Sequence, residues 1–160
     1  MMRAFFITAC VLTLIYIVAA FGIVSQVSSA RNMAFYEMLN DYSSDSYTYD
    51  DYSYDSGYSD MYEDEAESGT RLGGIISVVF MLISAVIFML ALMKIKTKTM
   101  KVMSIIGLSI SGLFLLWGFL PMTSPSGVSF DEVGPAFGLA GIAILAFNIV
   151  GTIHAFKTNS

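Results

Sequence analysis

Residues 72–93, LGGIISVVFMLISAVIFMLALM, run between Arg71 and Lys94 without a single charged side chain. A helix of about 20 apolar residues rises about 30 Å, which is enough to span the hydrocarbon core of a bilayer. Apolar side chains occupy every side of the helix that this stretch would form, which is typical of a segment surrounded by lipid. The stretch therefore predicts a transmembrane helix.

Three other segments without charge have a similar length and composition, namely 4–24, 102–120 and 134–153. Charged residues make up only 13% of the 160 residues, about half the share usual in soluble domains, while 56% are hydrophobic. A soluble fold of this size cannot bury so much apolar surface. The segments also lack the alternation expected of barrel strands. We therefore predict an all-α integral membrane protein, a four-transmembrane-helix bundle.

Lysine and arginine are distributed unequally between the two sides that four spans define. Basic residues are enriched in cytoplasmic connections. Six of the eight lie on the side that holds both termini and the connection after the second span: Arg3, Lys94, Lys96, Lys98, Lys101 and Lys157. We therefore expect a cell-membrane protein with both termini in the cytoplasm.

The chain then divides into three regions. Residues 1–30 form the first transmembrane helix, residues 31–71 an extracytoplasmic loop, and residues 72–160 a membrane region of three helices with spans 72–93, 102–120 and 134–153. The long loop separates the first span from the other three.

The first span allows two interpretations. Small residues at Ser28–Ala30 resemble a signal-peptide cleavage site, whereas the apolar run before them is longer than usual and favours an uncleaved signal anchor. Beyond the span, Met33, Tyr36 and Leu39 recur at helical spacing. If the first span is retained, we expect its helix to continue to about residues 40–41.

The loop contains the most unusual sequence of the chain, DYSSDSYTYDDYSYDSGYSDMYEDEAE, at residues 41–67. It holds seven of the nine tyrosines and few aliphatic residues, so its low-complexity composition predicts disorder in isolation. Tyrosine offers a large contact area with few rotatable bonds. We therefore expect this segment to bind a partner through Tyr47, Tyr49, Tyr52, Tyr54, Tyr58 and Tyr62.

The carboxylates of the loop produce a negative local field that attracts cations or a basic partner. They are Asp41, Asp45, Asp50, Asp51, Asp55, Asp60, Glu63, Asp64 and Glu65. Carboxylate oxygens suit calcium, but the spacing does not match an EF-hand loop. Weak binding of a divalent cation is therefore left open, and the identity of any metal is unknown.

Small residues recur at spacings of three and four in the last two spans, where they allow helices to approach closely in lipid. We expect these residues to pair the third and fourth spans with each other at the centre of the bundle. Asn148 is the one strongly polar residue deep in a span, and an interhelical hydrogen bond is its expected role. The packing candidates are Gly107, Ser111, Gly134, Gly138, Gly141 and Asn148.

Several kinds of chemistry lack a basis in the sequence. The single cysteine, Cys10, excludes an internal disulfide, and the spans hold no Asp, Glu, Lys or Arg of the kind that proton relays and ion-coupled transporters need. Phosphate-binding glycine loops and zinc-ligand spacings are absent. We expect neither an enzyme nor a cofactor, and no nucleic-acid partner.

The sequence thus favours a small multi-pass membrane protein that serves as a non-enzymatic interaction or accessory subunit. Its partners would be the lipid bilayer and a membrane or external protein, or a second copy of itself. The alternative is a homo-oligomeric pore or transport component in which the acidic loop forms a cation-attracting vestibule.

Overall fold

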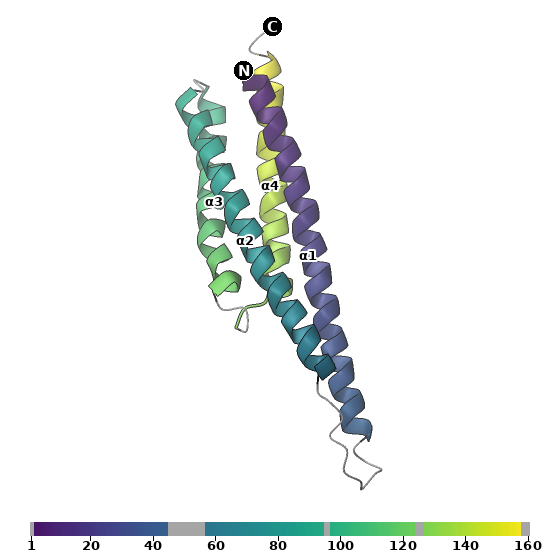
Figure 1. The fold of residues 1–160 in the computed structure, drawn as a ribbon. Coiled ribbons are helices and arrows are strands. Elements are labelled where there is room, and N and C mark those ends of the chain that lie inside the picture. The colour runs from purple at the N-terminus through teal and green to yellow at the C-terminus, as the bar shows by residue number, and fades with distance from the viewer. Residues whose placement is uncertain (1, 45–56, 95–96, 124–126, 158–160) are drawn as a thin grey trace.

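A computed structural model describes residues 2–44, 57–94, 97–123 and 127–157 (Figure 1). These residues form four helices and no strand: α1 (Met2–Ser44), α2 (Gly57–Lys94), α3 (Lys98–Thr123) and α4 (Phe130–Lys157). Each helix contains a stretch long and apolar enough to cross a membrane. The prediction of an all-helical chain with four candidate membrane spans is confirmed.

The four helices form a bundle whose chain ends lie together. Figure 1 shows the N-terminus, the C-terminus and the α2–α3 connection at one end, and the α3–α4 connection toward the other. α3 packs mainly against α2, and α4 packs mainly against α1, while α1 and α2 also lie against each other. Contacts between α3 and α4 are much less extensive.

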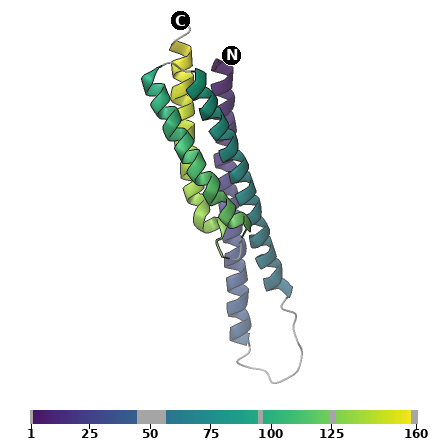
Figure 2. The ribbon, with the colours of Figure 1, turned by 90° about the vertical axis from the view of Figure 1, so that its left-hand side faces the viewer.

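α1 and α2 are too long to end with the bundle. α1 has 43 residues and α2 has 38, whereas α3 and α4 have 26 and 28. At about 1.5 Å per residue, α1 is about 64 Å long, roughly twice the thickness of a hydrocarbon core. Both views show α1 and α2 continuing together past the α3–α4 connection (Figures 1 and 2). We call this two-helix extension, residues 31–44 and 57–70, the stalk.

The stalk sharpens two predictions about the connection between the first spans. The expected continuation of the first helix is confirmed, and the helix ends at Ser44. Disorder of residues 41–67 in isolation stays a prediction, but within the bundle residues 41–44 belong to α1 and residues 57–67 to α2. The physical reason is packing: Ala66 joins a buried cluster with Val27 and Ala30 of α1, so α2 gains a stabilising neighbour well before its apolar span begins.

Rings seated over glycines hold the bundle together. A Cβ atom added to Gly107 would lie 2.6 Å from the Phe88 ring, and one added to Gly151 would lie 2.5 Å from the Phe6 ring. Gly138 faces Phe21 in the same way. Glycine therefore lets an aromatic ring of a neighbouring helix rest against the backbone, where a Cβ atom would force the ring to move.

These contacts overturn the expected pairing of the third and fourth spans. On α3, Gly107 faces Phe88 of α2, and Ser111, one turn further on, is fully buried. On α4, Gly134, Gly138 and Gly141 face α1. The glycine-rich helices therefore pack against the helices that carry bulky side chains, because a ring fills the space above a glycine better than a second small residue does.

Candidate functional site

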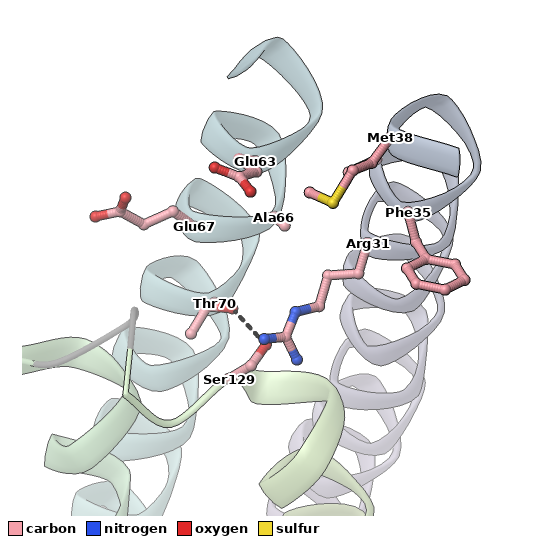
Figure 3. A pocket seen from close by; sticks show the side chains of 9 residues that line it. Arg31, Phe35, Met38, Glu63, Ala66, Glu67, Thr70 and Ser129 are labelled. Carbon is pink, nitrogen blue, oxygen red and sulfur yellow. Dashed lines mark hydrogen bonds between the residues drawn. The ribbon is translucent and has the colours of Figure 1, made fainter. Parts of the chain in front are cut away.

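A groove opens between the two helices of the stalk, next to its base (Figure 3). Its volume is about 360 Å³, within the range of small ligand pockets. α1, α2 and the residue before α4 all contribute to its walls. The residues that line it are Arg31, Ala34, Phe35, Met38, Glu63, Ala66, Glu67, Thr70 and Ser129. We call it the stalk groove.

Helical spacing explains why these residues converge. Positions 31, 34, 35 and 38 share one face of α1, and positions 63, 66, 67 and 70 share one face of α2. Ala34 and Ala66 are buried, and their small side chains leave space between the helices. Phe35 and Met38 remain exposed by 58% and 53%. The groove therefore combines a narrow alanine floor with a wide apolar rim on α1.

The base of the groove is tied to the start of α4 by an arginine. Arg31 Nη1 lies 3.3 Å from Asp131 Oδ1 and 3.5 Å from Glu132 Oε1. Both carboxylates belong to the first turn of α4, where negative charge also interacts favourably with the helix dipole. Because Arg31 is half exposed, each ion pair contributes about 1 kcal/mol or less to stability.

A buried polar contact joins the start of α4 to α2 as well. The hydroxyl oxygens of Thr70 and Ser129 lie 3.2 Å apart, drawn as a dashed line in Figure 3, and the amide of Phe130 donates to Thr70 Oγ1 over 3.3 Å. The Phe130 ring is fully buried against Gly73, where an added Cβ atom would lie 2.5 Å from it. The beginning of α4 is thus fixed to both α1 and α2, which gives the stalk groove a rigid base.

The acidic side of the groove lies on α2. Glu67 forms an ion pair with Arg71, one turn further along the helix, in which Arg71 Nη2 donates to Glu67 Oε1 over 2.7 Å. Among the described residues, no lysine or arginine lies within salt-bridge distance of Glu63. The Glu63 carboxylate on the groove wall therefore has no ion-pair partner among the residues that the structure describes.

The predicted partner-binding and cation-attracting residues fall into two groups. Tyr47, Tyr49, Tyr52, Tyr54, Asp45, Asp50, Asp51 and Asp55 lie outside the described residues. The others belong to the stalk helices. Of these, Glu63 lines the groove, Tyr62 is half-buried, and Asp60, Asp64 and Glu65 are exposed on α2; Asp41 belongs to α1 and Tyr58 to α2.

Sequence reasoning missed most of the groove. It placed the start of the second helix near Arg71, so Ala66 and Thr70 were assigned to a loop. The signal that could have found them is the matched spacing of 31, 34, 35 and 38 with 63, 66, 67 and 70. The charged composition of residues 57–67 hid this pattern.

A second polar feature lies within the bundle, at the depth of the spans. Asn148 Nδ2 donates to Thr13 Oγ1 over 3.2 Å, which is the interhelical hydrogen bond expected of this asparagine. Tyr16 OH donates to Ser77 Oγ over 3.1 Å, and its ring stacks on Phe80. We call Thr13, Tyr16, Ser77 and Asn148 the polar seam.

The seam links three helices through neutral groups. Its hydrogen bonds join α1 to α4 and α1 to α2. Asn148 Oδ1 and the buried Ser111 Oγ have no hydrogen-bond partner among the described residues. The seam can orient the helices, because hydrogen bonds in lipid have few competitors.

The described part of the chain contains no group of three or more His, Cys, Asp or Glu side chains that could hold a metal ion. Family models, curated proteins and solved structures were compared with the chain, and none of the three comparisons gives a match. The stalk and its groove are therefore interpreted from their own chemistry.

Proposed function

We propose that this chain is a small membrane protein that acts as a non-enzymatic interaction or accessory subunit, and that the stalk is the part that binds its partner. The observation that carries the proposal is the apolar surface of α1 beyond the bundle. It is formed by residues that are each at least half exposed: Met33, Phe35, Tyr36, Met38 and Leu39.

The length of α1 supports a position of this surface outside the hydrocarbon core. Residues 4–30 carry no charge and already span about 40 Å of helix. Arg31, Asp131 and Glu132 follow at one level, where the four-helix region ends. Large apolar side chains further along α1 then face water, and an exposed apolar patch outside lipid is typical of an interaction site.

The arrangement of the chain ends supports the orientation proposed from the sequence. Both termini and the α2–α3 connection lie at one end of the bundle (Figure 1), and the ends of α2, α3 and α4 there carry Lys94, Lys98, Lys101 and Lys157. Because basic residues favour the cytoplasmic side, we assign this end to the cytoplasm. The stalk and the acidic, tyrosine-rich segment then face the extracytoplasmic side of the cell membrane.

Photo-crosslinking in native membranes tests the proposal. A photoreactive amino acid replaces Tyr36 on the stalk, and a matched variant carries it in place of Trp117, an exposed residue on the membrane-spanning part of α3. We expect Tyr36 to give a discrete adduct with another protein, whereas Trp117 gives adducts with lipid. Adducts from Tyr36 that contain only lipid would contradict the proposal.

The same experiment separates the accessory role from the alternative of a homo-oligomeric pore. If the stalk adduct contains only further copies of this chain, the stalk mediates self-association instead of binding a different protein, and the pore becomes the better hypothesis. Cation flux through liposomes that hold the purified oligomer, lost when the loop acids are neutralised, would then support the pore.

A further inference from the structure

The stalk presents two different chemistries side by side. α1 contributes large apolar side chains beside Arg31 and the half-buried Glu37, whereas α2 contributes the carboxylates of Asp60, Glu63, Asp64, Glu65 and Glu67. The stalk groove lies where the two meet, with Phe35 and Met38 on one wall and Glu63 and Glu67 on the other (Figure 3). A ligand that fits both walls must be apolar along its length and positive at one end.

The charges around the groove do not balance. Four carboxylates lie on or next to its wall, on Glu63, Glu67, Asp131 and Glu132, against the two guanidinium groups of Arg31 and Arg71. Arg31 and Arg71 are both engaged in ion pairs with three of these acids. The local excess of negative charge is therefore centred on Glu63, which belongs to the α2 side of the groove lining.

The apolar walls suit the aliphatic part of a basic side chain. Lysine and arginine lay their methylene groups along apolar surface and keep the charged end in a polar environment. Ala34 and Ala66 leave room for such a chain, and Phe35 adds an aromatic ring that can interact with a cation. A volume of about 360 Å³ accommodates one long side chain rather than a folded domain.

Two other occupants are less compatible with these charges. A second copy of the chain would bring its own acidic α2 against this one, and like charges held close together repel. Anionic lipid headgroups would be repelled by the same carboxylates. A basic segment of a different protein has the complementary charge.

We propose that the stalk groove binds a lysine or arginine side chain from an amphipathic segment of the partner protein, with its aliphatic stem between Phe35, Met38 and Ala66 and its cation against Glu63. This inference rests on the proposed accessory function and names the chemistry of the partner. The partner segment carries apolar residues beside the basic one, which cover Tyr36 and Leu39.

The test uses the full chain in nanodiscs of zwitterionic lipid and a synthetic amphipathic peptide of leucine and lysine that carries a fluorophore and one photoreactive leucine. A control peptide has the same sequence with every lysine acetylated, which removes the charge and keeps the stem. We expect the lysine peptide to crosslink to the stalk at or beside Phe35 and Met38, and the acetylated peptide to lose this adduct.

Two matched variants separate the groove from general attraction to acidic residues. Glu63→Gln and Glu65→Gln each remove one negative charge from the same helix, but only Glu63 lines the groove. We expect Glu63→Gln to weaken peptide binding by about 3- to 5-fold, the scale of one exposed ion pair. Glu65→Gln should change it by less than about 2-fold.

A third variant tests the space between the helices. Ala66→Phe fills the groove floor and should abolish the crosslink at Phe35, while circular dichroism shows whether the helices remain formed. Equal effects of Glu63→Gln and Glu65→Gln, or peptide adducts outside the stalk, would overturn the inference. The accessory function would still stand if Tyr36 continued to crosslink to another protein in native membranes, so the two failures are distinguishable.

Discussion

α1 passes through two regions of the molecule, the bundle and the stalk, and its exposed apolar side chains have different surroundings in each. Val18, in the bundle, is 72% exposed, and Tyr36, in the stalk, is 69% exposed. In the bundle, lipid covers such a residue at no cost, since hydrocarbon chains are as apolar as the side chain. In the placement we propose, the same exposure in the stalk meets water, where apolar surface is unfavourable by about 25 cal/mol per Å².

The two regions also differ in how their helices are held. In the bundle, aromatic rings sit over glycines and neutral polar groups bond between helices. In the stalk, the small residues Ala34 and Ala66 are buried, while several large apolar side chains of α1 are exposed. Contacts between helices therefore account for the packing of the bundle, whereas the exposed apolar surface of the stalk is what we propose a partner protein covers.

The largest expected effect comes from filling a glycine contact in the bundle. Gly107→Ala places a methyl group against the Phe88 ring, and such overpacking costs about 1–3 kcal/mol in the free energy of unfolding. Denaturation of the purified protein in mixed micelles, followed by circular dichroism, measures the change.

The matched control is Gly112→Ala on the same helix, because an added Cβ atom at Gly112 meets nothing within 4 Å. This variant should be neutral or gain up to about 1 kcal/mol from better helix propensity. Equal destabilisation by both substitutions would contradict the ring-over-glycine account of the bundle.

A smaller effect is expected within the polar seam. A double-mutant cycle of Thr13→Val and Asn148→Leu isolates the hydrogen bond between α1 and α4. Interhelical hydrogen bonds in membrane proteins are worth about 0.6 kcal/mol on average, so we expect a coupling energy of that size. A coupling energy indistinguishable from zero would show that the seam does not bind α4 to α1.

The salt bridge at the base of the stalk should contribute least to overall stability. Arg31→Gln removes the ion pairs to Asp131 and Glu132 and is expected to cost about 1 kcal/mol or less. Its effect should instead be local, with faster amide hydrogen exchange in the first turn of α4. Unchanged exchange there would show that Arg31 does not secure the base of the groove.

Substitution of the stalk surface itself should leave stability almost unchanged. Tyr36→Ser with Leu39→Ser alters exposed side chains only, and such changes usually fall within about 0.5 kcal/mol. The same pair should abolish protein crosslinks from a photoreactive group at position 35. Crosslinking that persists at its original level would mean that these residues are not part of the interaction surface.

The sequence predicted the spans well because their signal is local. Stretches without charge, such as 72–93, need no knowledge of their neighbours to be recognised as helices of membrane length. Pairing of helices was predicted wrongly, because a glycine such as Gly138 indicates that something approaches closely but not which helix supplies the ring. That choice depends on the shapes of four helices at once.

The stalk was only half predicted for a related reason. The continuation of α1 followed from the spacing of Met33, Tyr36 and Leu39. The matching part of α2 was hidden by its acidic composition, since Ala66 and Gly69 acquire meaning only when Val27 and Ala30 lie opposite. Composition indicates whether a segment can fold by itself. Residues 57–67 are helical because they pack against α1, which their composition does not indicate.

The central claim is that α1 leaves the membrane and carries an exposed apolar face into water. Single cysteines at Val18 and Tyr36, in a chain whose only natural cysteine is changed by Cys10→Ser, allow the most direct test. In nanodiscs, a membrane-impermeant maleimide should modify position 36 rapidly and leave position 18 unmodified, although the two residues are almost equally exposed in the structure. Protection of position 36 to the level of position 18 would contradict the account.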